Sequence, residues 1–391
     1  MGKRKGVESS IALADAAAMC RVDTVVAYPI TPQTHIVEHL SEWVNDGHLD
    51  AEFIPVESEH SALSAAIGTS ATGARTFTAT SSQGLALMHE ILFIAAAMRT
   101  PIVMAVANRA LSGPINIWND HSDIMAERDI GWVQIFAENG QECFDLVPAC
   151  FRVAEDRRVH LPTILNFDGF IVSHMIEPIE YWTQEQFDAY LPPFDPQIRL
   201  DIRNPVAMGV VGIPEIYYEA RRAQHEALMQ AKSVVQEAFE ALERQVGRRY
   251  NLVETYKTDD ADAILYLMGA LSETAMTAVD NLRAQGKKVG LVHPRLWRPF
   301  PTKEILTAFG NVPVIGVCDR AMAFGMEHHP VAQEIRTLLY DAPHRPQLCE
   351  FVIGLGGRDV TVGDMEYILN RLLDVKNGAA AGPVEYVGVR Q

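Results

Sequence analysis

The sequence predicts an α/β protein with two open, mostly parallel sheets, joined by a linker and a long helix. Apolar runs rich in β-branched residues alternate with segments of helical spacing over residues 1–190, and the alternation resumes at residue 259. Strands that are apolar at consecutive positions suit a parallel sheet, because helices cover both of its faces. We therefore expect domains at 1–190 and 259–375, a linker region at 191–258 and a tail at 376–391.

In the first domain, strands are expected at TVVAYPITP (24–32), AEFIPV (51–56), ARTFTATSS (74–82) and PIVMAVANR (101–109). Helices are expected between them at HIVEHLSEWV (35–44), HSALSAAIG (60–68) and LALMHEILFIAAAM (85–98). Each strand is followed by a helical pattern, which is the order of repeated βαβ units.

The linker region begins with LPPFDPQIRLDIRNP (191–205), which holds too many prolines for a regular element. A long helix is expected from Glu215 to Val246, with apolar residues spaced three and four apart. In the second domain we expect strands at 263–270, 287–297, 313–319 and 349–357, and a helix at 272–286 closed by Gly286. The turn MGALSETA lacks the G-x-G-x-x-G pattern, so a packing turn is favoured over dinucleotide binding.

Charge and composition exclude several classes of protein. The net charge of -17, without a dense basic patch, argues against a nucleic-acid or anionic-membrane partner. No apolar window is long enough for a membrane span and no signal peptide is evident, so a cytoplasmic protein is expected. The five cysteines form no C-x-x-C pair, which favours buried free thiols over a zinc or iron–sulfur site in this chain.

Two glutamates, Glu57 and Glu59, stand at the start of a run of small residues, IPVESEHSALSAAIGTSATGARTFTATSSQG. Carboxylates at a helix N-terminus are favoured by the helix dipole, so a structural role is one interpretation. The nearby TATSSQG, at a strand end, favours the other interpretation, since Ser81, Ser82 and Gly84 allow a ring or phosphate to approach closely.

Two further motifs follow buried strands, where open α/β folds bind ligands. Thr31 lies in AYPITPQT, which indicates either a rigid turn or a ligand site. Arg109 ends a strand, and its planar fork matches a carboxylate, although a salt bridge to a nearby aspartate is an equal alternative. A metal site in the D-H-x-D cluster at 120–123 is disfavoured, and no metal ligand is assigned.

Several motifs together closely resemble the α subunit of the 2-oxoacid:ferredoxin oxidoreductases, nearest to the pyruvate branch. The resemblance runs in order through nearly the whole chain and includes YPITP, ESEHSA, TSSQG, NRALSGPINIWNDHSD, RDIGWVQIFAEN, LPTILNFDGFIVSH, RLWRPFP and GLGGRDVT. It implies a thiamine-diphosphate enzyme that converts a 2-oxoacid and coenzyme A to acyl-CoA and CO2, with electrons passed to ferredoxin. The two domains are then a pyrimidine-side domain and a transketolase C-terminal-like domain.

The resemblance also implies roles for individual residues. Glu59 matches the acid that hydrogen-bonds N1′ of the aminopyrimidine and favours its imino tautomer. Thr31 and Arg109 match the residues that contact the carbonyl and the carboxylate of the substrate. Further neighbours are expected beside the cofactor (Pro29, Ser82 and Gln83) and beside the substrate (Asn119).

Missing motifs imply partner chains. The family's G-D-G signature for diphosphate and Mg2+ is absent, and FDG at 167–169 has the wrong first residue. The resemblance therefore implies a β-type subunit that holds diphosphate, Mg2+ and a [4Fe–4S] cluster, with γ- and δ-type subunits carrying other clusters. Alternatives are another 2-oxoacid (oxalate, 2-oxoglutarate, branched-chain or phenylglyoxylate), a transketolase-type or dehydrogenase-type thiamine enzyme without clusters, and a non-catalytic scaffold subunit.

Overall fold

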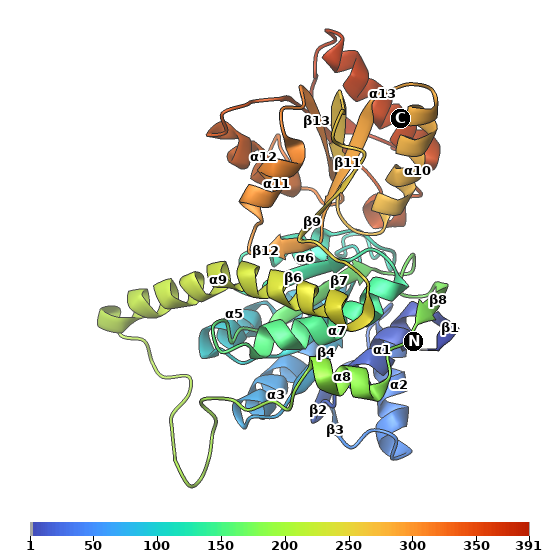
Figure 1. Cartoon of the computed structure of the whole chain (residues 1–391). Coiled ribbons are helices and arrows are strands. Elements are labelled where there is room, and N and C mark those ends of the chain that lie inside the picture. Colours follow the sequence, from blue (N-terminus) through green and yellow to red (C-terminus); the bar gives the residue numbers. More distant parts are fainter. Residues whose placement is uncertain (1–2, 391) are drawn as a thin grey trace.

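The computed structural model describes residues 3–390, which form three sheets (Figure 1). A seven-stranded sheet has the order β12-β6-β7-β5-β4-β2-β3, and a six-stranded sheet has the order β15-β14-β13-β10-β11-β9. Strands β1 (Arg4–Glu8) and β8 (Ile176–Glu180) form a small antiparallel pair. We call the seven-stranded sheet with its helices the first domain and the six-stranded sheet with its helices the second domain. The predicted fold class, two mostly parallel α/β sheets, is confirmed.

The strands of the first domain run parallel, except for β12. They are β2 (Thr24–Ala27), β3 (Glu52–Pro55), β4 (Thr76–Thr80), β5 (Val103–Asn108), β6 (Val133–Ala137) and β7 (Thr163–Asp168). Strand β12 (Leu296–Arg298) pairs antiparallel with β6, although it comes from within the second domain's part of the chain. The carboxyl ends of the parallel strands therefore meet at one edge of the sheet.

Helices cover both faces of this sheet. On one face lie α1 (Ser9–Met19), α2 (Thr34–Asn45) and α7 (Gly140–Glu155), and on the other α3 (Glu59–Ala71), α4 (Ser82–Leu87), α5 (His89–Met98) and α6 (Ser122–Ala126). The helix α8 (Gln184–Tyr190) follows β8. The prediction of a single helix at 85–98 is wrong, because the chain forms two helices that meet at Met88.

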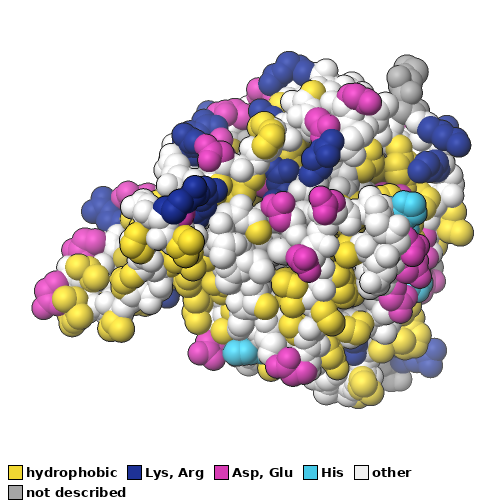
Figure 2. All heavy atoms as spheres, turned by 90° about the horizontal axis from the view of Figure 1, so that it is seen from below, with side chains coloured by type: hydrophobic (Ala, Val, Ile, Leu, Met, Phe, Trp, Pro, Cys, Tyr) yellow, Lys and Arg dark blue, Asp and Glu magenta, His cyan; other side chains and the backbone are white. Residues whose placement is uncertain are grey.

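The long helix α9 (Pro214–Val246) packs its apolar stripe against α7, as its spacing predicts. The preceding residues 191–213 contain no helix or strand. The first turns of α9 project from the molecule together with this linker (Figure 1). Apolar side chains are exposed along the projecting arm (Figure 2), among them Ile202, Val210, Val211, Ile216, Tyr217 and Tyr218.

The second domain is built on a sheet of β9 (Val253–Tyr256), β10 (Ala263–Tyr266), β11 (Val289–Pro294), β13 (Val314–Asp319), β14 (Gln347–Val352) and β15 (Glu385–Tyr386). Its helices are α10 (Leu271–Ala284), α11 (Thr302–Phe309), α12 (Pro330–Tyr340) and α13 (Val362–Lys376), with a short 3-10 turn at Leu355–Gly357. Strand β9 comes from the linker region and β15 from the tail.

The single strand expected at 287–297 is wrong, because the chain changes sheets at Arg295. Strand β11 belongs to the second domain, whereas β12 belongs to the first. The buried guanidinium of Arg295 lies 2.6 Å from Glu142 of α7 and 2.7 Å from Glu254 of β9. This buried cluster holds the crossing point, since an unpaired charge there would be costly. None of the helices in residues 3–390 is long and apolar enough to span a membrane.

Candidate active site

The residues predicted to form the site come together at the carboxyl edge of the first domain's sheet. Residues 28–32 follow β2, residues 81–84 follow β4, and Arg109 follows β5. Glu59, the first residue of α3, reaches the same edge after the connection from β3. Parallel strands bring these distant segments together, which is why open α/β folds bind ligands at this edge.

The two glutamates of the sequence motif have different environments. Glu57 is exposed and accepts a hydrogen bond from Ser61 Oγ at 2.5 Å, which lowers its pKa. Ser58 is the N-cap of α3, and its hydroxyl accepts from the Ser61 N–H. Glu59, the first residue of α3, is 7% exposed. Its carboxylate forms no hydrogen bond or ion pair with another residue of the range 3–390. Glu59 is also the acidic residue in the first turn of α3, so the helix-dipole interpretation applies to it as well.

A glycine makes room beside Glu59. A Cβ on Gly84 would lie 2.8 Å from Glu59 Oε1 and 2.5 Å from Thr80 Oγ1, so only glycine fits between these side chains. The hydroxyl of Thr80 is itself buried without a hydrogen-bond partner among the described residues. A buried hydroxyl without a partner is costly unless something else binds it, and the neighbouring carboxylate oxygens of Glu59 are not fully buried. These observations fit a polar ligand bound at this point.

Arg109 is held by backbone carbonyls rather than by an acid. Its Nε donates to Asn116 O at 2.8 Å and its Nη1 to Thr31 O at 3.0 Å, while Nη2 has no partner among residues 3–390. Burial lowers the pKa of Arg109, and the nearby Asp123 opposes that shift. Asp123 binds the Arg109 backbone N–H at 3.0 Å instead of the guanidinium. The salt-bridge alternative is therefore not the arrangement found, and the guanidinium keeps donors for an anionic ligand.

Thr31 and Pro29 are exposed at the rim of this region, as is Tyr28. The structure brings Thr31 to Arg109 through its backbone carbonyl. Below the turn, the buried Gln33 donates from Nε2 to Tyr28 O at 2.8 Å, which fixes the turn's shape.

Ser82 and Gln83 begin α4, with Ser82 fully buried at φ +47°. The hydroxyl of Ser82 donates to Ala110 O at 2.6 Å, and it also lies 2.7 Å from Gln83 Oε1. Its N–H donates to Asp123 Oδ2 at 3.1 Å. The Ser82 side chain thus fastens the end of β4 to the end of β5, and only its neighbour Gln83 retains a partly exposed side chain.

Asn119 and His121 contact the second domain through Asp168, at the end of β7. Asp168 Oδ1 accepts from Asn119 Nδ2 at 3.2 Å, lies 3.1 Å from His121 Nε2 and pairs with the Arg320 guanidinium. Its Oδ2 accepts from the Ala270 N–H at 2.7 Å. Burial alone would raise the pKa of Asp168, but the charge of Arg320 and the contact with His121 hold it far below its usual range. Asn119, expected beside the substrate, has its side-chain amide directed at Asp168.

Sequence reasoning missed the roles of Asp123 and Asp168. Asp123 accepts four hydrogen bonds, from Ser82 N–H, Arg109 N–H, Asn108 Nδ2 and its neighbouring Ile124 N–H. Both aspartates lie in motifs that sequence reasoning considered as metal or diphosphate sites. Nothing in either motif indicates that a carboxylate binds backbone N–H groups of distant strands.

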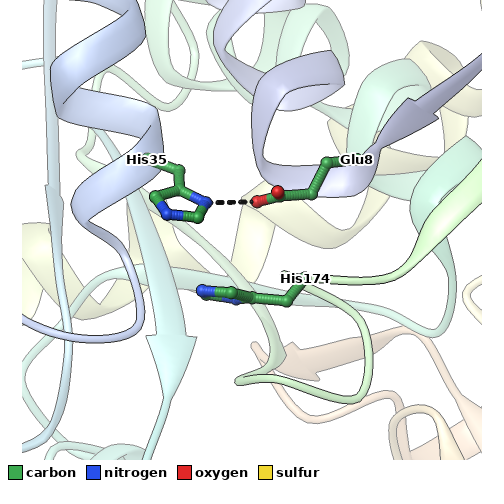
Figure 3. A group of neighbouring side chains, drawn as sticks. All are labelled: Glu8, His35 and His174. Atoms are coloured by element: carbon green, nitrogen blue, oxygen red, sulfur yellow. Dashed lines mark hydrogen bonds and ion pairs between the residues drawn. The ribbon is translucent and has the colours of Figure 1, made fainter.

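One group of residues with metal-ligating side chains was not anticipated from sequence. Glu8, His35 and His174 lie together at the start of α1, on α2 and after β7 (Figure 3). Glu8 Oε1 and His35 Nδ1 are 2.7 Å apart, and the ring of His174 lies against that of His35 with centroids 4.7 Å apart. His174 Nδ1 is 2.7 Å from Ser173 Oγ. The group is a hydrogen-bonded pair with a third ring tilted at 37° against that of His35.

Comparison with solved structures places the fold. The chain matches a 2-oxoglutarate:ferredoxin oxidoreductase from Magnetococcus marinus with a TM-score of 0.72 at 18% identity, covering 96% of this chain and 66% of that one. A split-gene transketolase matches with a TM-score of 0.55 at 10% identity, over 95% of this chain and 100% of that one. The fold is thus that of the oxidoreductase and transketolase class.

Sequence comparison is more specific. Residues 15–240 match the model of the thiamine-diphosphate-binding domain of pyruvate flavodoxin/ferredoxin oxidoreductases, and residues 261–365 match core domain II of pyruvate:ferredoxin oxidoreductase. The pyruvate synthase subunit PorA of Pyrococcus horikoshii is 44% identical over 99% of this chain and 98% of its own length, and that of Thermotoga maritima is 44% identical over 100% and 99%. The ketoisovalerate oxidoreductase subunit VorA of Pyrococcus horikoshii is also 44% identical, over 98% and 96%. The chain belongs to the pyruvate:ferredoxin oxidoreductase family.

Proposed function

We propose that this chain is the α subunit of a pyruvate:ferredoxin oxidoreductase that uses thiamine diphosphate. Pyruvate and coenzyme A give acetyl-CoA and CO2, with release of one proton and two electrons to ferredoxin, or the reaction runs in reverse. The observation that carries the proposal is Glu59, a largely buried residue at the carboxyl edge of the sheet, whose carboxylate has no partner within residues 3–390. Several relatives are named pyruvate synthase subunits, which supports pyruvate as substrate.

The residues around Glu59 fit the aminopyrimidine part of thiamine diphosphate. Gly84 leaves space for a flat ring beside the carboxyl group, and Glu59 would hold a proton at the ring nitrogen N1′. The bound cofactor supplies the carbanion chemistry on the 2-oxoacid. Pro29 and Gln83, both near this edge, are proposed to line the cofactor.

Substrate binding is assigned to Arg109 and Thr31. The guanidinium has free donors at Nη2 and is oriented by two carbonyl acceptors, so a carboxylate of a 2-oxoacid fits there. The exposed hydroxyl of Thr31 is proposed to lie near the substrate carbonyl. Asn119 contributes indirectly, because its amide is bonded to Asp168.

Partner subunits complete the proposed enzyme. All five cysteines are buried and unpaired, and among residues 3–390 no cysteine belongs to a group of three or more side chains placed to ligate a metal. We assign the diphosphate, Mg2+ and one [4Fe–4S] cluster to a β-type subunit, and the other clusters to γ- and δ-type subunits that pass electrons to ferredoxin. The names of the relatives as subunits support such a complex. The free thiols support a cytoplasmic location.

The test is Glu59→Gln in the assembled complex, because glutamine keeps the shape of the side chain but cannot exchange a proton at N1′. We expect turnover to fall at least about a hundredfold, with subunit composition unchanged. Glu57→Gln is the matched control, since this exposed acid lies two residues away and should leave turnover unchanged. Near-normal turnover of Glu59→Gln would favour a non-catalytic scaffold.

The substrate is tested separately with pyruvate, 2-oxoisovalerate, 2-oxoglutarate, oxalate and phenylglyoxylate, each with coenzyme A. Pyruvate should give the highest kcat/KM. A branched 2-oxoacid is the second candidate, because a relative named as a ketoisovalerate oxidoreductase subunit is as similar as the pyruvate synthase subunits. A higher kcat/KM for 2-oxoisovalerate would assign the chain to that substrate.

A further inference from the structure

A glycine-rich turn of the second domain lies against the loop that follows Arg109. The turn comes after β14 in the motif GLGGRDVT, and three of its residues have positive φ: Gly354 (+63°), Gly356 (+57°) and Gly357 (+75°). The loop approaches so closely that side chains at the turn would collide with it. A Cβ on Gly357 would lie 2.3 Å from Trp118 Cβ, and one on Gly356 would lie 2.5 Å from Asn116 Nδ2.

Hydrogen bonds join the turn to this loop on both sides. Asn116 Nδ2 donates to Gly356 O at 3.0 Å, and the Gly356 N–H donates to Asp120 Oδ2 at 3.0 Å. The Gly357 N–H donates to Asn119 O at 2.7 Å. Glycine turns of this kind often bind anions with their N–H groups. Here the N–H groups of Gly356 and Gly357 are already bonded to the loop, so the turn is a docking point for the loop.

The same loop holds the substrate-binding guanidinium. Arg109 Nε donates at 2.8 Å to the carbonyl of Asn116, the residue whose amide is bonded to the turn. Within the loop, Asn116 Oδ1 accepts from the Trp118 N–H at 2.7 Å, and Trp118 O accepts from the Ala110 N–H at 2.9 Å. Asn116 is therefore bonded to the turn by its side chain and to Arg109 by its backbone.

We infer that the glycine turn at 354–357 positions the guanidinium of Arg109 through Asn116, and so determines how tightly the carboxylate of the substrate binds. This inference rests on the proposed function, in which Arg109 binds that carboxylate. Asn116 is a positioning residue, since it acts through Arg109. The second domain thereby contributes to substrate affinity, although none of its side chains up to residue 390 is hydrogen-bonded to the guanidinium.

The experiment uses two variants of the assembled complex. Gly357→Ala pushes the turn away from Trp118. Asn116→Ala keeps the carbonyl that accepts from Arg109 and removes the amide bond to the turn, together with the bond from the Trp118 N–H within the loop. We expect KM for pyruvate to rise about tenfold in each, because the carbonyl that orients the Arg109 guanidinium is no longer held by the turn, with kcat changed less than about threefold. If Gly357→Ala does not fold, Asn116→Ala still tests the inference.

Gly286→Ala is the matched control. This glycine also has a positive φ, +81°, but a Cβ there meets nothing within 4 Å, so the substitution adds backbone strain without touching the loop. Its KM should equal that of the wild type. A rise in KM as large as that of Gly357→Ala would overturn the inference, because strain in the second domain alone would then explain the effect.

Hydrogen exchange of residues 109–121, measured by mass spectrometry, gives a readout independent of turnover. We expect faster exchange in Gly357→Ala and Asn116→Ala than in the wild type and in Gly286→Ala. Unchanged exchange, or faster exchange with unchanged KM, overturns the inference. If the wild-type complex turns over no 2-oxoacid, the proposed function fails, and the exchange rates still decide whether the turn holds the loop.

Discussion

Gly84 lies directly against the carboxyl group of Glu59, close enough that a Cβ at position 84 would come within 2.8 Å of Oε1. The two residues begin different helices, since Glu59 starts α3 and Gly84 lies in the first turn of α4. The position of the proposed proton-handling acid therefore depends on the absence of a side chain on a neighbouring helix.

We predict that Gly84→Ala reduces turnover about tenfold or more, because the added methyl group must displace Glu59 or Thr80. Overpacking of this kind also costs about 1–3 kcal/mol of stability. Gly68→Ala is the control, since Gly68 lies in the same helix as Glu59 and a Cβ there meets nothing within 4 Å. Steady-state assays of both complexes decide the matter, and equal turnover would show that Glu59 tolerates displacement.

Arg109→Lys should raise KM for the 2-oxoacid about tenfold while thiamine diphosphate binding is kept. Lysine supplies one point charge where arginine supplies a planar fork held by two carbonyls. Arg21→Lys is the control, because Arg21 also uses its fork, on Asp188 at 2.7 and 2.8 Å, but at the surface. Titration of the cofactor and initial rates give both quantities, and an unchanged KM would mean that Arg109 does not bind substrate.

Asp168→Asn should destabilise the chain by about 3 kcal/mol, since it leaves the buried Arg320 without its acid. The same substitution at Asp188 breaks an exposed pair with Arg21 and should cost less than about 1 kcal/mol. Urea unfolding of this chain, followed by pulse proteolysis, measures both values. Similar costs for the two variants would show that the contact between Asp168 and Arg320 contributes little to stability.

Asp123 makes the stability of the chain depend on pH. Burial raises its pKa to about 7, opposed by hydrogen bonds from Arg109, Asn108 and Ser82, while the charge of Asp120 raises it further. The unfolded value is about 3.9, so the folded chain binds this proton more tightly. The contribution of Asp123 to the free energy of unfolding is therefore complete below about pH 4 and is lost as the pH rises through 7.

We therefore predict that the urea midpoint of the wild type falls between about pH 4 and 7 relative to that of Asp123→Asn, whose amide does not titrate. Pulse proteolysis at several pH values across this range measures the difference between the two curves. If the urea midpoints of the two proteins changed in parallel with pH, the pKa of Asp123 would not be raised in the folded chain.

Patterns with a local physical cause were predictable from the sequence. Consecutive apolar residues give the parallel strands, and the three-and-four spacing gives α9 from Pro214 instead of the expected Glu215. The convergence of the segments around Thr31, Glu59 and Arg109 follows from the direction of parallel strands, because each motif comes directly after a strand.

Features that depend on distant partners were not predictable. The split of residues 287–297 between two sheets depends on Arg295 meeting Glu142, which is 153 positions away in the chain. In the sequence Asp123 is an ordinary loop residue. Only the folded chain brings to it two backbone N–H groups, which follow β4 and β5. The bond from the Asn119 amide to Asp168 also joins distant segments, and the substrate role that the resemblance implies for Asn119 stays a prediction.

Because β12 pairs with the first domain's sheet, the point at which the chain is cut determines whether a fragment has a complete sheet. A fragment ending at residue 258 would lack β12 and leave β6 as an uncovered outer strand, with its hydrogen-bonding groups open to other chains. Such a fragment would tend to aggregate, whereas one that extends past Arg298 keeps the edge covered. The two sheets should therefore be expressed as a single unit.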